Sequence, residues 1–141
     1  MCFINIWLLP DTGDDTDFPT NTRSILGVFP ETVDLTVDSP KVAAMPRAVA
    51  VSPRMCDCRS LIGSPDDCAP GELTYSQIRA WLDFLAESYG RKARIGLIRA
   101  WSPRKRIQPD SAMSVRLKDI SEEFLRGLEE KQLVVIRFSQ W

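Results

Sequence analysis

Residues 2–9 have the sequence CFINIWLL. Apolar side chains occupy both alternating faces of it, and they show no helical period. Such a pattern is typical of a strand that is covered on both sides, and strands of this kind lie in the interior of a sheet. We therefore expect residues 2–9 to form a central strand around which the other elements are built.

The remaining strands are predicted from short apolar or alternating segments. Residues 32–37 alternate between apolar and polar side chains, as expected of an outer strand. The other segments are more apolar, and they are residues 47–52, 94–101 and 133–138. Together with residues 2–9, the chain therefore has five predicted strands.

Three helices are predicted between these strands. Thr74 and Gln77 form a capping-box pattern ahead of an amphipathic segment that ends at Gly90, which favours a helix over residues 74–89. Ser121 is placed to cap a later helix, and a short helix is expected over residues 17–29.

This order of elements favours an α+β fold, specifically a ferredoxin-like split βαβ sheet (βαββαβ) with an added C-terminal αβ unit. The chain of 141 residues is expected to form one domain over residues 1–141. With right-handed crossovers, the strand order is 4-1-3-2, so the first strand lies between the third and the fourth and runs antiparallel to both.

Two long loops are expected to interrupt this order. Residues 53–73 contain three prolines, two glycines and three of the four cysteines, which favours an irregular loop. Residues 102–112 are basic and broken by proline, and we expect a second loop there.

The topology predicts a meeting point for the cysteines. Cys2 starts the first strand, whereas Cys56 and Cys58 follow the end of the third, antiparallel strand, and Cys68 lies further along the same loop. All four can therefore meet at one edge of the sheet. Four thiolates suit a tetrahedral zinc ion, although Cys-x-Cys is shorter than the usual zinc knuckle.

Two other interpretations of the cysteines remain open at this point. They can be independent buried residues, because cysteine behaves as a small hydrophobic side chain. Alternatively, Cys56 or Cys58 can act as the nucleophile of a thiol-dependent redox or hydrolytic protein.

The charge of the chain is near zero overall but uneven along it. Residues 1–46 carry two basic and seven acidic side chains, whereas residues 90–106 carry seven basic side chains and no acidic one. The basic stripe 90–106 allows nucleic-acid binding, but the net charge of −1 and the absence of aromatic RNA-binding motifs argue against it. We interpret the stripe as a solvated face, or as ion-pair partners for the acidic N-terminal third.

Composition excludes several kinds of active site. The chain has no histidine, which rules out Ser-His-Asp and Cys-His catalysis and His-ligated metals. No segment has the length of a membrane span or the pattern of a signal peptide, so we expect a cytoplasmic location without membrane attachment.

The sequence thus favours a small binding or interaction module over an enzyme, with zinc as the cofactor to test. A protein partner or a second copy of the chain is the expected kind of partner, and Trp141 is a residue through which another subunit could be contacted.

Overall fold

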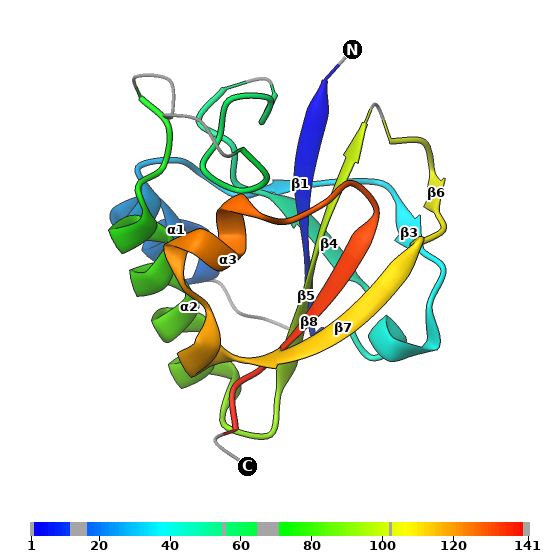
Figure 1. The fold of residues 1–141 in the computed structure, drawn as a ribbon. Coiled ribbons are helices and arrows are strands. Elements are labelled where there is room, and N and C mark those ends of the chain that lie inside the picture. Colours follow the sequence, from blue (N-terminus) through cyan, green and yellow to red (C-terminus); the bar gives the residue numbers. More distant parts are fainter. Residues whose placement is uncertain (1, 12–16, 55, 65–70, 102, 140–141) are drawn as a thin grey trace.

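The computed structural model describes residues 2–11, 17–54, 56–64, 71–101 and 103–139. A six-stranded sheet runs through its middle (Figure 1). In spatial order its strands are β2 (Glu31–Thr32), β4 (Arg47–Ala50), β1 (Phe3–Leu9), β5 (Arg94–Trp101), β8 (Gln132–Arg137) and β7 (Ser111–Arg116). The protein is therefore a mixed α+β structure with β1 in the interior of the sheet.

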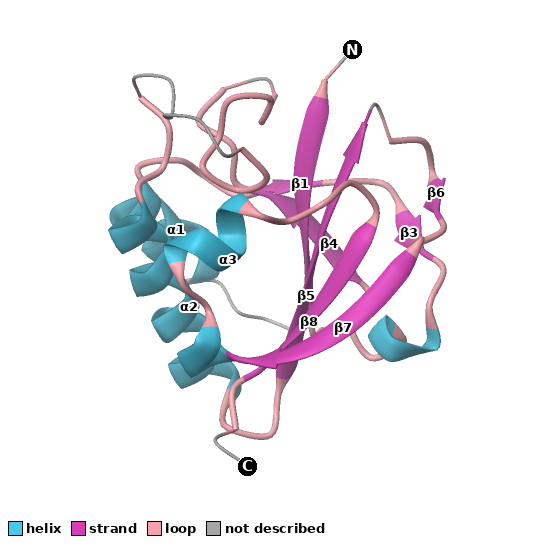
Figure 2. Cartoon of the chain, viewed as in Figure 1, coloured by secondary structure: helices cyan, strands magenta, loops and turns pink. Residues whose placement is uncertain are grey.

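Three helices cover one face of this sheet, as Figure 2 shows. They are α1 (Phe18–Leu26), α2 (Tyr75–Tyr89) and α3 (Glu122–Arg126). Trp7 of β1 packs edge-to-face on Trp81 of α2, with ring centroids 5.2 Å apart, and Trp81 Nε1 donates to Thr22 Oγ1 of α1 at 3.1 Å. This contact joins the central strand to two helices, because both indoles are almost fully buried.

The opposite face carries a second, smaller apolar core. It is covered by a two-stranded parallel sheet of β3 (Thr36–Val37) and β6 (Arg106–Ile107) and by a 3-10 helix, Pro40–Val42. Val37, Val42 and Ile107 pack there against side chains of the main sheet. Both faces of β1 are therefore covered, which is why its sequence is apolar on both sides.

The expected neighbours of the first strand are confirmed. β1 pairs antiparallel with β4, where Trp7 lies opposite Val49, and antiparallel with β5, where Ile6 lies opposite Ile98. The sheet then continues through β8, antiparallel to β5, to β7, which runs parallel to β8.

A ferredoxin-like split arrangement is not confirmed as a whole. The outer strand expected over 32–37 is divided, since β2 contributes two residues to the main sheet and β3 belongs to the smaller sheet. Val33 N–H still donates to the Ala48 carbonyl at 2.9 Å, but Thr36 N–H donates to the Lys105 carbonyl at 2.7 Å. The chain thus crosses from one sheet to the other within this segment.

The prediction of a loop over residues 102–112 was wrong in part. Residues 106–107 form β6, and residues 111–112 begin β7, an edge strand with mostly exposed or half-buried side chains. An edge strand needs no alternating apolar pattern, so periodicity did not indicate it. The 74–89 helix is confirmed, because Thr74 and Gln77 form the predicted capping box and the helix spans Tyr75–Tyr89.

The basic stripe 90–106 does not form one continuous surface. Arg94 at the start of β5 is exposed, whereas Arg99 in the same strand is only 4% exposed. Arg106 pairs with Asp38 of the acidic N-terminal third, with Nη1 and Oδ2 3.6 Å apart. The expectation of ion pairing with that region is met at this residue.

Among the helices in the described part of the chain, none is both long and apolar enough to cross a membrane. Trp141 lies outside the described residues.

Candidate metal centre

Three cysteines from two distant parts of the chain lie together. Cys2 immediately precedes β1, whereas Cys56 and Cys58 lie in the loop that follows β4. Their three Sγ atoms all lie within 4.8 Å of one another, and the side chains are half-buried free thiols. In a tetrahedral zinc site with Zn–S bonds of about 2.3 Å, the sulfur atoms are about 3.8 Å apart. A small approach of the three sulfur atoms toward one another would therefore give the spacing that zinc requires.

Backbone hydrogen bonds hold the loop against the start of β1. Phe3 N–H donates to Cys58 Sγ at 3.3 Å, and Asp57 N–H donates to the Phe3 carbonyl at 2.8 Å. Because Phe3 follows Cys2 directly, these two bonds align the loop cysteines with Cys2.

The side chain of Asp57 anchors the loop from the other side. It is 3% exposed as a residue, and its Oδ2 accepts from Asn5 N–H and from Ser52 Oγ, each at 2.8 Å. Burial raises the pKa of the Asp57 carboxyl, while these two hydrogen bonds and the charge of Arg99 oppose that rise. Asp57, which lies between the two loop cysteines, is thus fixed to β1 and to Ser52, two residues after the end of β4.

Arg99 of β5 connects the cysteine loop to β1. Its Nη1 lies within hydrogen-bond distance of three oxygen atoms, which are Asn5 Oδ1 at 3.1 Å, the Asp57 carbonyl at 3.0 Å and the Ile62 carbonyl at 2.9 Å. The guanidinium also lies over the Phe3 ring, with Cζ 4.3 Å from the ring centroid. One buried cation therefore connects β1, β5 and the cysteine loop.

Gly63 makes room for this arginine. A Cβ atom placed on Gly63 would lie 2.4 Å from Arg99 Cδ, and the residue has φ +79°. Both its close approach and its backbone conformation require glycine. The loop can therefore close over Arg99 only because position 63 has no side chain.

The neighbouring thiols have opposite pKa shifts. A hydrogen bond with Cys56 is the main cause that raises the pKa of Cys2 to about 11, and burial and the charges of Cys56 and Cys58 add to it. A hydrogen bond from the Cys58 backbone is the main cause that lowers the pKa of Cys56, supported by hydrogen bonds with the other two thiols. In the metal-free group, Cys56 therefore loses its proton at a lower pH than Cys2 does.

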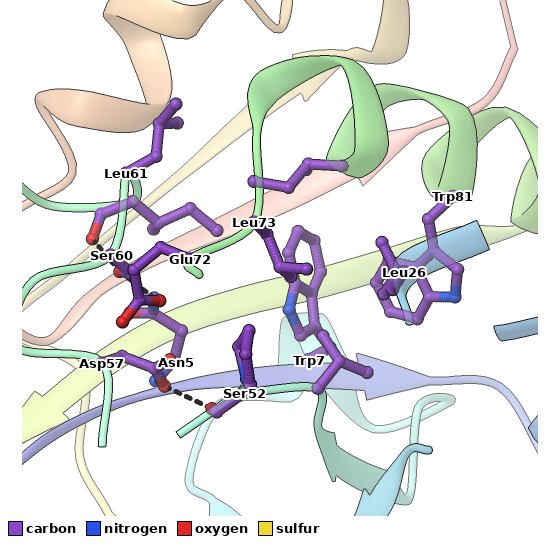
Figure 3. Close-up of a pocket in the computed structure, with 14 residues that line it drawn as sticks. Asn5, Trp7, Leu26, Ser52, Asp57, Ser60, Leu61, Glu72, Leu73 and Trp81 are labelled. Carbon is purple, nitrogen blue, oxygen red and sulfur yellow. Dashed lines mark hydrogen bonds between the residues drawn. The ribbon is translucent and has the colours of Figure 1, made fainter. Parts of the chain in front are cut away.

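A narrow pocket lies next to this loop, between β1 and α2 (Figure 3). Polar side chains, among them Asp57, Ser60 and Glu72, gather at one end, and Trp7, Leu26 and Trp81 line the other. The cavity itself is small, about 20 Å³, which is room for about one water molecule.

The structure brings together three of the four cysteines that the sequence predicts as ligands. Cys68 lies outside the described residues. Cys2, Cys56 and Cys58 are not separate in space, since their Sγ atoms form one group.

Sequence reasoning missed two buried charged side chains next to the site, Arg99 and Glu72. An arginine within the apolar segment RIGLIRAW was a signal for a buried charge, but it was assigned to the basic stripe. Comparison with known proteins found no matching family model, no similar curated protein and no similar solved structure.

Proposed function

We propose that the protein is a small binding or interaction module whose cysteine group holds a structural zinc ion. The observation that carries this proposal is that Cys2 meets Cys56 and Cys58, which lie more than fifty residues later in the chain. Thiolate sulfur is a preferred ligand of zinc, and a metal bridging Cys2 to the loop would add its binding free energy to the stability of that junction.

Cys68 is the proposed fourth ligand. It follows Cys58 in the same loop, and four thiolates complete the closed tetrahedral site that structural zinc normally has. Three protein ligands would instead leave one position open, as catalytic zinc sites do. The fold supports the structural role, because the site closes a long loop onto the first strand.

A reducing, cytoplasmic location forms part of this proposal. The three described cysteines are free thiols, and zinc binding needs thiolates that have not been oxidised to disulfides. The order β2-β4-β1-β5 additionally supports a ferredoxin-like origin for that part of the sheet.

The test is metal analysis of the chain purified without a metal-affinity tag, paired with thiol counts before and after denaturation. About one zinc ion per chain is expected, with thiols that react only after denaturation or chelation. Cys58→Ser should lose the metal, whereas Ser111→Ala, on the exposed edge of β7, should keep it. Cys68→Ser distinguishes four protein ligands from three. Metal-free protein with four reactive thiols would contradict the proposal.

A second candidate function is thiol-disulfide exchange between Cys56 and Cys2. The two Sγ atoms lie within 4.8 Å, and the pKa of Cys56 is lowered while that of Cys2 is raised. With glutathione disulfide as oxidant, the Cys56 thiolate would attack one sulfur and release one glutathione thiolate. The Cys2 sulfur, after losing its proton, would then displace the second glutathione and form the Cys2–Cys56 disulfide. In the thiol count, this outcome removes two thiols without any bound metal.

A further inference from the structure

Strand β7 forms one edge of the main sheet, as Figure 1 shows. It pairs with β8 on one side, and no strand of the described residues pairs with it on the other. The strand is six residues long, whereas β2 at the opposite edge of the sheet has only two residues. The outer edge of β7 is therefore a row of backbone groups with which a further strand can pair.

β7 also lacks the residues that normally keep an edge strand from pairing with another chain. Proline and charged side chains within the strand are common devices of this kind. Ser111–Arg116 contains no proline, and its one charged residue, Arg116, lies at its end. The other edge strand, β2, is very short and includes Glu31. Pairing with another chain is therefore expected at β7 rather than at β2.

The hydrogen bonds of the neighbouring strands show which residues of β7 direct their backbone groups outward. Phe138 N–H donates to the Ala93 carbonyl, so the even-numbered residues of β8 face β5 and the odd-numbered ones face β7. Leu133, one of the odd-numbered residues, lies opposite Ala112 in a parallel ladder, where it bonds to the residues on either side of Ala112. The outward N–H and C=O groups therefore belong to Ala112, Ser114 and Arg116.

Two copies of β7 can pair antiparallel about a two-fold axis at Met113. Ala112 of one copy then lies opposite Ser114 of the other, and these outward-facing residues exchange two hydrogen bonds on each side of the axis. Asp110, just before β7, lies opposite Arg116, so opposite charges meet at both ends of the pairing. A shift of the axis by one residue in either direction would lose both of these charge contacts.

The side chains at the axis are compatible with this arrangement. Met113 is half-buried and packs against the core on the helix-covered face of the sheet. At the axis it would meet its own copy in a non-hydrogen-bonded pair, where side chains on neighbouring strands are closest. On the other face, Ala112 and Ser114 are exposed and small, so they offer no obstacle to a second strand.

We infer that the chain forms a symmetric dimer in which β7 pairs antiparallel with β7 of a second copy. The main sheets of the two copies become one continuous sheet. A second copy is the partner that the charges favour, because the two-fold axis places each Asp110 against an Arg116. This inference does not depend on bound zinc.

The first test follows the oligomeric state of the full chain by sedimentation equilibrium, over about 10 µM to 1 mM protein with a reducing agent present. We expect a monomer–dimer equilibrium that a metal chelator leaves unchanged. Amide hydrogen exchange at Ala112 and Ser114 should slow as the dimer forms, whereas Met113, whose N–H faces β8, should change little. A monomer at every concentration, dissociation by chelator, or new protection away from β7 would each overturn the inference.

Charge reversal tests the register of the pairing. Arg116→Asp puts two aspartates opposite each other at each end and should weaken the dimer by about 10-fold or more. Asp110→Arg should weaken it similarly, and the double variant Asp110→Arg/Arg116→Asp should dimerise within about 3-fold of the parent chain, because opposite charges meet again.

Asp119→Asn is the matched control for these variants. Within its own chain Arg116 Nε lies 3.0 Å from Asp119 Oδ2, and this exposed ion pair is also lost in Arg116→Asp. Asp119→Asn removes that pair and leaves the contacts between copies intact, so it should dimerise as the parent chain does. A dimer that Arg116→Asp does not weaken, or that the double variant does not restore, would overturn the inference. Should a variant fail to fold, the exchange measurement on the parent chain still decides.

Discussion

Arg99 Nη1 lies 3.0 Å from the carbonyl oxygen of Asp57, so a cation in the interior of β5 donates to the backbone between two cysteines. Burial lowers the pKa of Arg99, while the negative charge of Asp57 opposes that shift. The guanidinium stays charged at any ordinary pH, because the pKa of arginine is so high. The charged Arg99 side chain therefore fixes the cysteine loop, and two carbonyl groups of that loop, on Asp57 and Ile62, in turn hold Arg99 in place.

Replacing Arg99 by methionine is predicted to destabilise the fold. Asn5 Oδ1 would lose its donor, and an unsatisfied buried acceptor costs about 1–3 kcal/mol. The carbonyls of Asp57 and Ile62 would each lose the hydrogen bond from Arg99 but keep one from Ser60, from its N–H and its Oγ respectively. We expect the free energy of unfolding in urea to fall by about 2 kcal/mol or more. Arg94→Met, at the exposed start of the same strand, should change it by only about 0.5 kcal/mol. Similar losses for both variants would show that the buried network is not what stabilises the loop.

Gly63→Ala is predicted to be more destabilising than Gly27→Ala. Both glycines have nearly the same positive φ, +79° and +78°, so both variants carry the left-handed backbone cost of about 1–2 kcal/mol. At Gly27 no atom lies within 4 Å of the added Cβ, whereas at Gly63 it meets Arg99 Cδ at 2.4 Å. Overpacking should add about 1–3 kcal/mol at Gly63 alone. Chemical unfolding of the two variants side by side measures this difference, and equal losses would contradict the close packing of Arg99.

The central part of the sheet could be predicted from a strong local signal, and the meeting of the cysteines followed from the topology of that sheet. Residues 2–9 are apolar on both faces, which only an interior strand explains. Once that strand lay between its antiparallel neighbours, its start had to face the end of the strand that precedes Cys56. Topology therefore predicted a contact that sequence spacing does not indicate.

The supporting network could not be predicted in the same way. Two of the three acceptors of Arg99 are backbone carbonyls, which every residue has, and all three lie 37 or more residues away in sequence. Glu72 gives no local signal either, since a glutamate in a loop is normally exposed and only tertiary packing buries it. The short strands β3 and β6 have two residues each, too few for a periodic pattern.

The stability of the protein is predicted to rise on mild acidification through Glu72. Burial, together with the charge of Asp57, raises the pKa of the Glu72 carboxyl above its ordinary value of 4.5, against the effect of Arg54. The folded chain then binds the proton more tightly than the unfolded chain does. The free energy of unfolding therefore increases as the pH falls through the raised pKa toward 4.5.

Glu72→Gln removes this titration and is predicted to flatten the dependence of stability on pH. The measurement is urea unfolding of the parent chain and the variant at a series of pH values from about 4.5 to neutral. Glu87→Gln, exposed on α2, is the matched control and should leave the curve unchanged. Asp57 shifts in the same direction, so some dependence should remain in the variant. Parallel curves for the parent chain and Glu72→Gln would show that Glu72 does not titrate as its burial requires.

The thiols of the metal-free group are predicted to differ in reactivity. A hydrogen bond from the Cys58 backbone lowers the pKa of Cys56, whereas a hydrogen bond with Cys56 is the main cause that raises the pKa of Cys2 to about 11. The thiolate is the reactive form, so at about pH 7.5 iodoacetamide should modify Cys56 before Cys2. Peptide mass spectrometry of the chelator-treated chain after short exposures measures the order of modification.

Two further measurements connect this order to the geometry. Cys56→Ser should lower the pKa of Cys2 and accelerate its alkylation. The serine hydroxyl is neutral, so the hydrogen bond to the Cys56 thiolate and its negative charge, which raise the pKa of Cys2, are both removed. Added zinc should protect Cys2 and Cys56 together if one ion binds both, since the bound thiolates no longer react freely. Modification of Cys2 first, or protection of only one of the two thiols, would mean that the sulfur atoms do not act as a single group in solution.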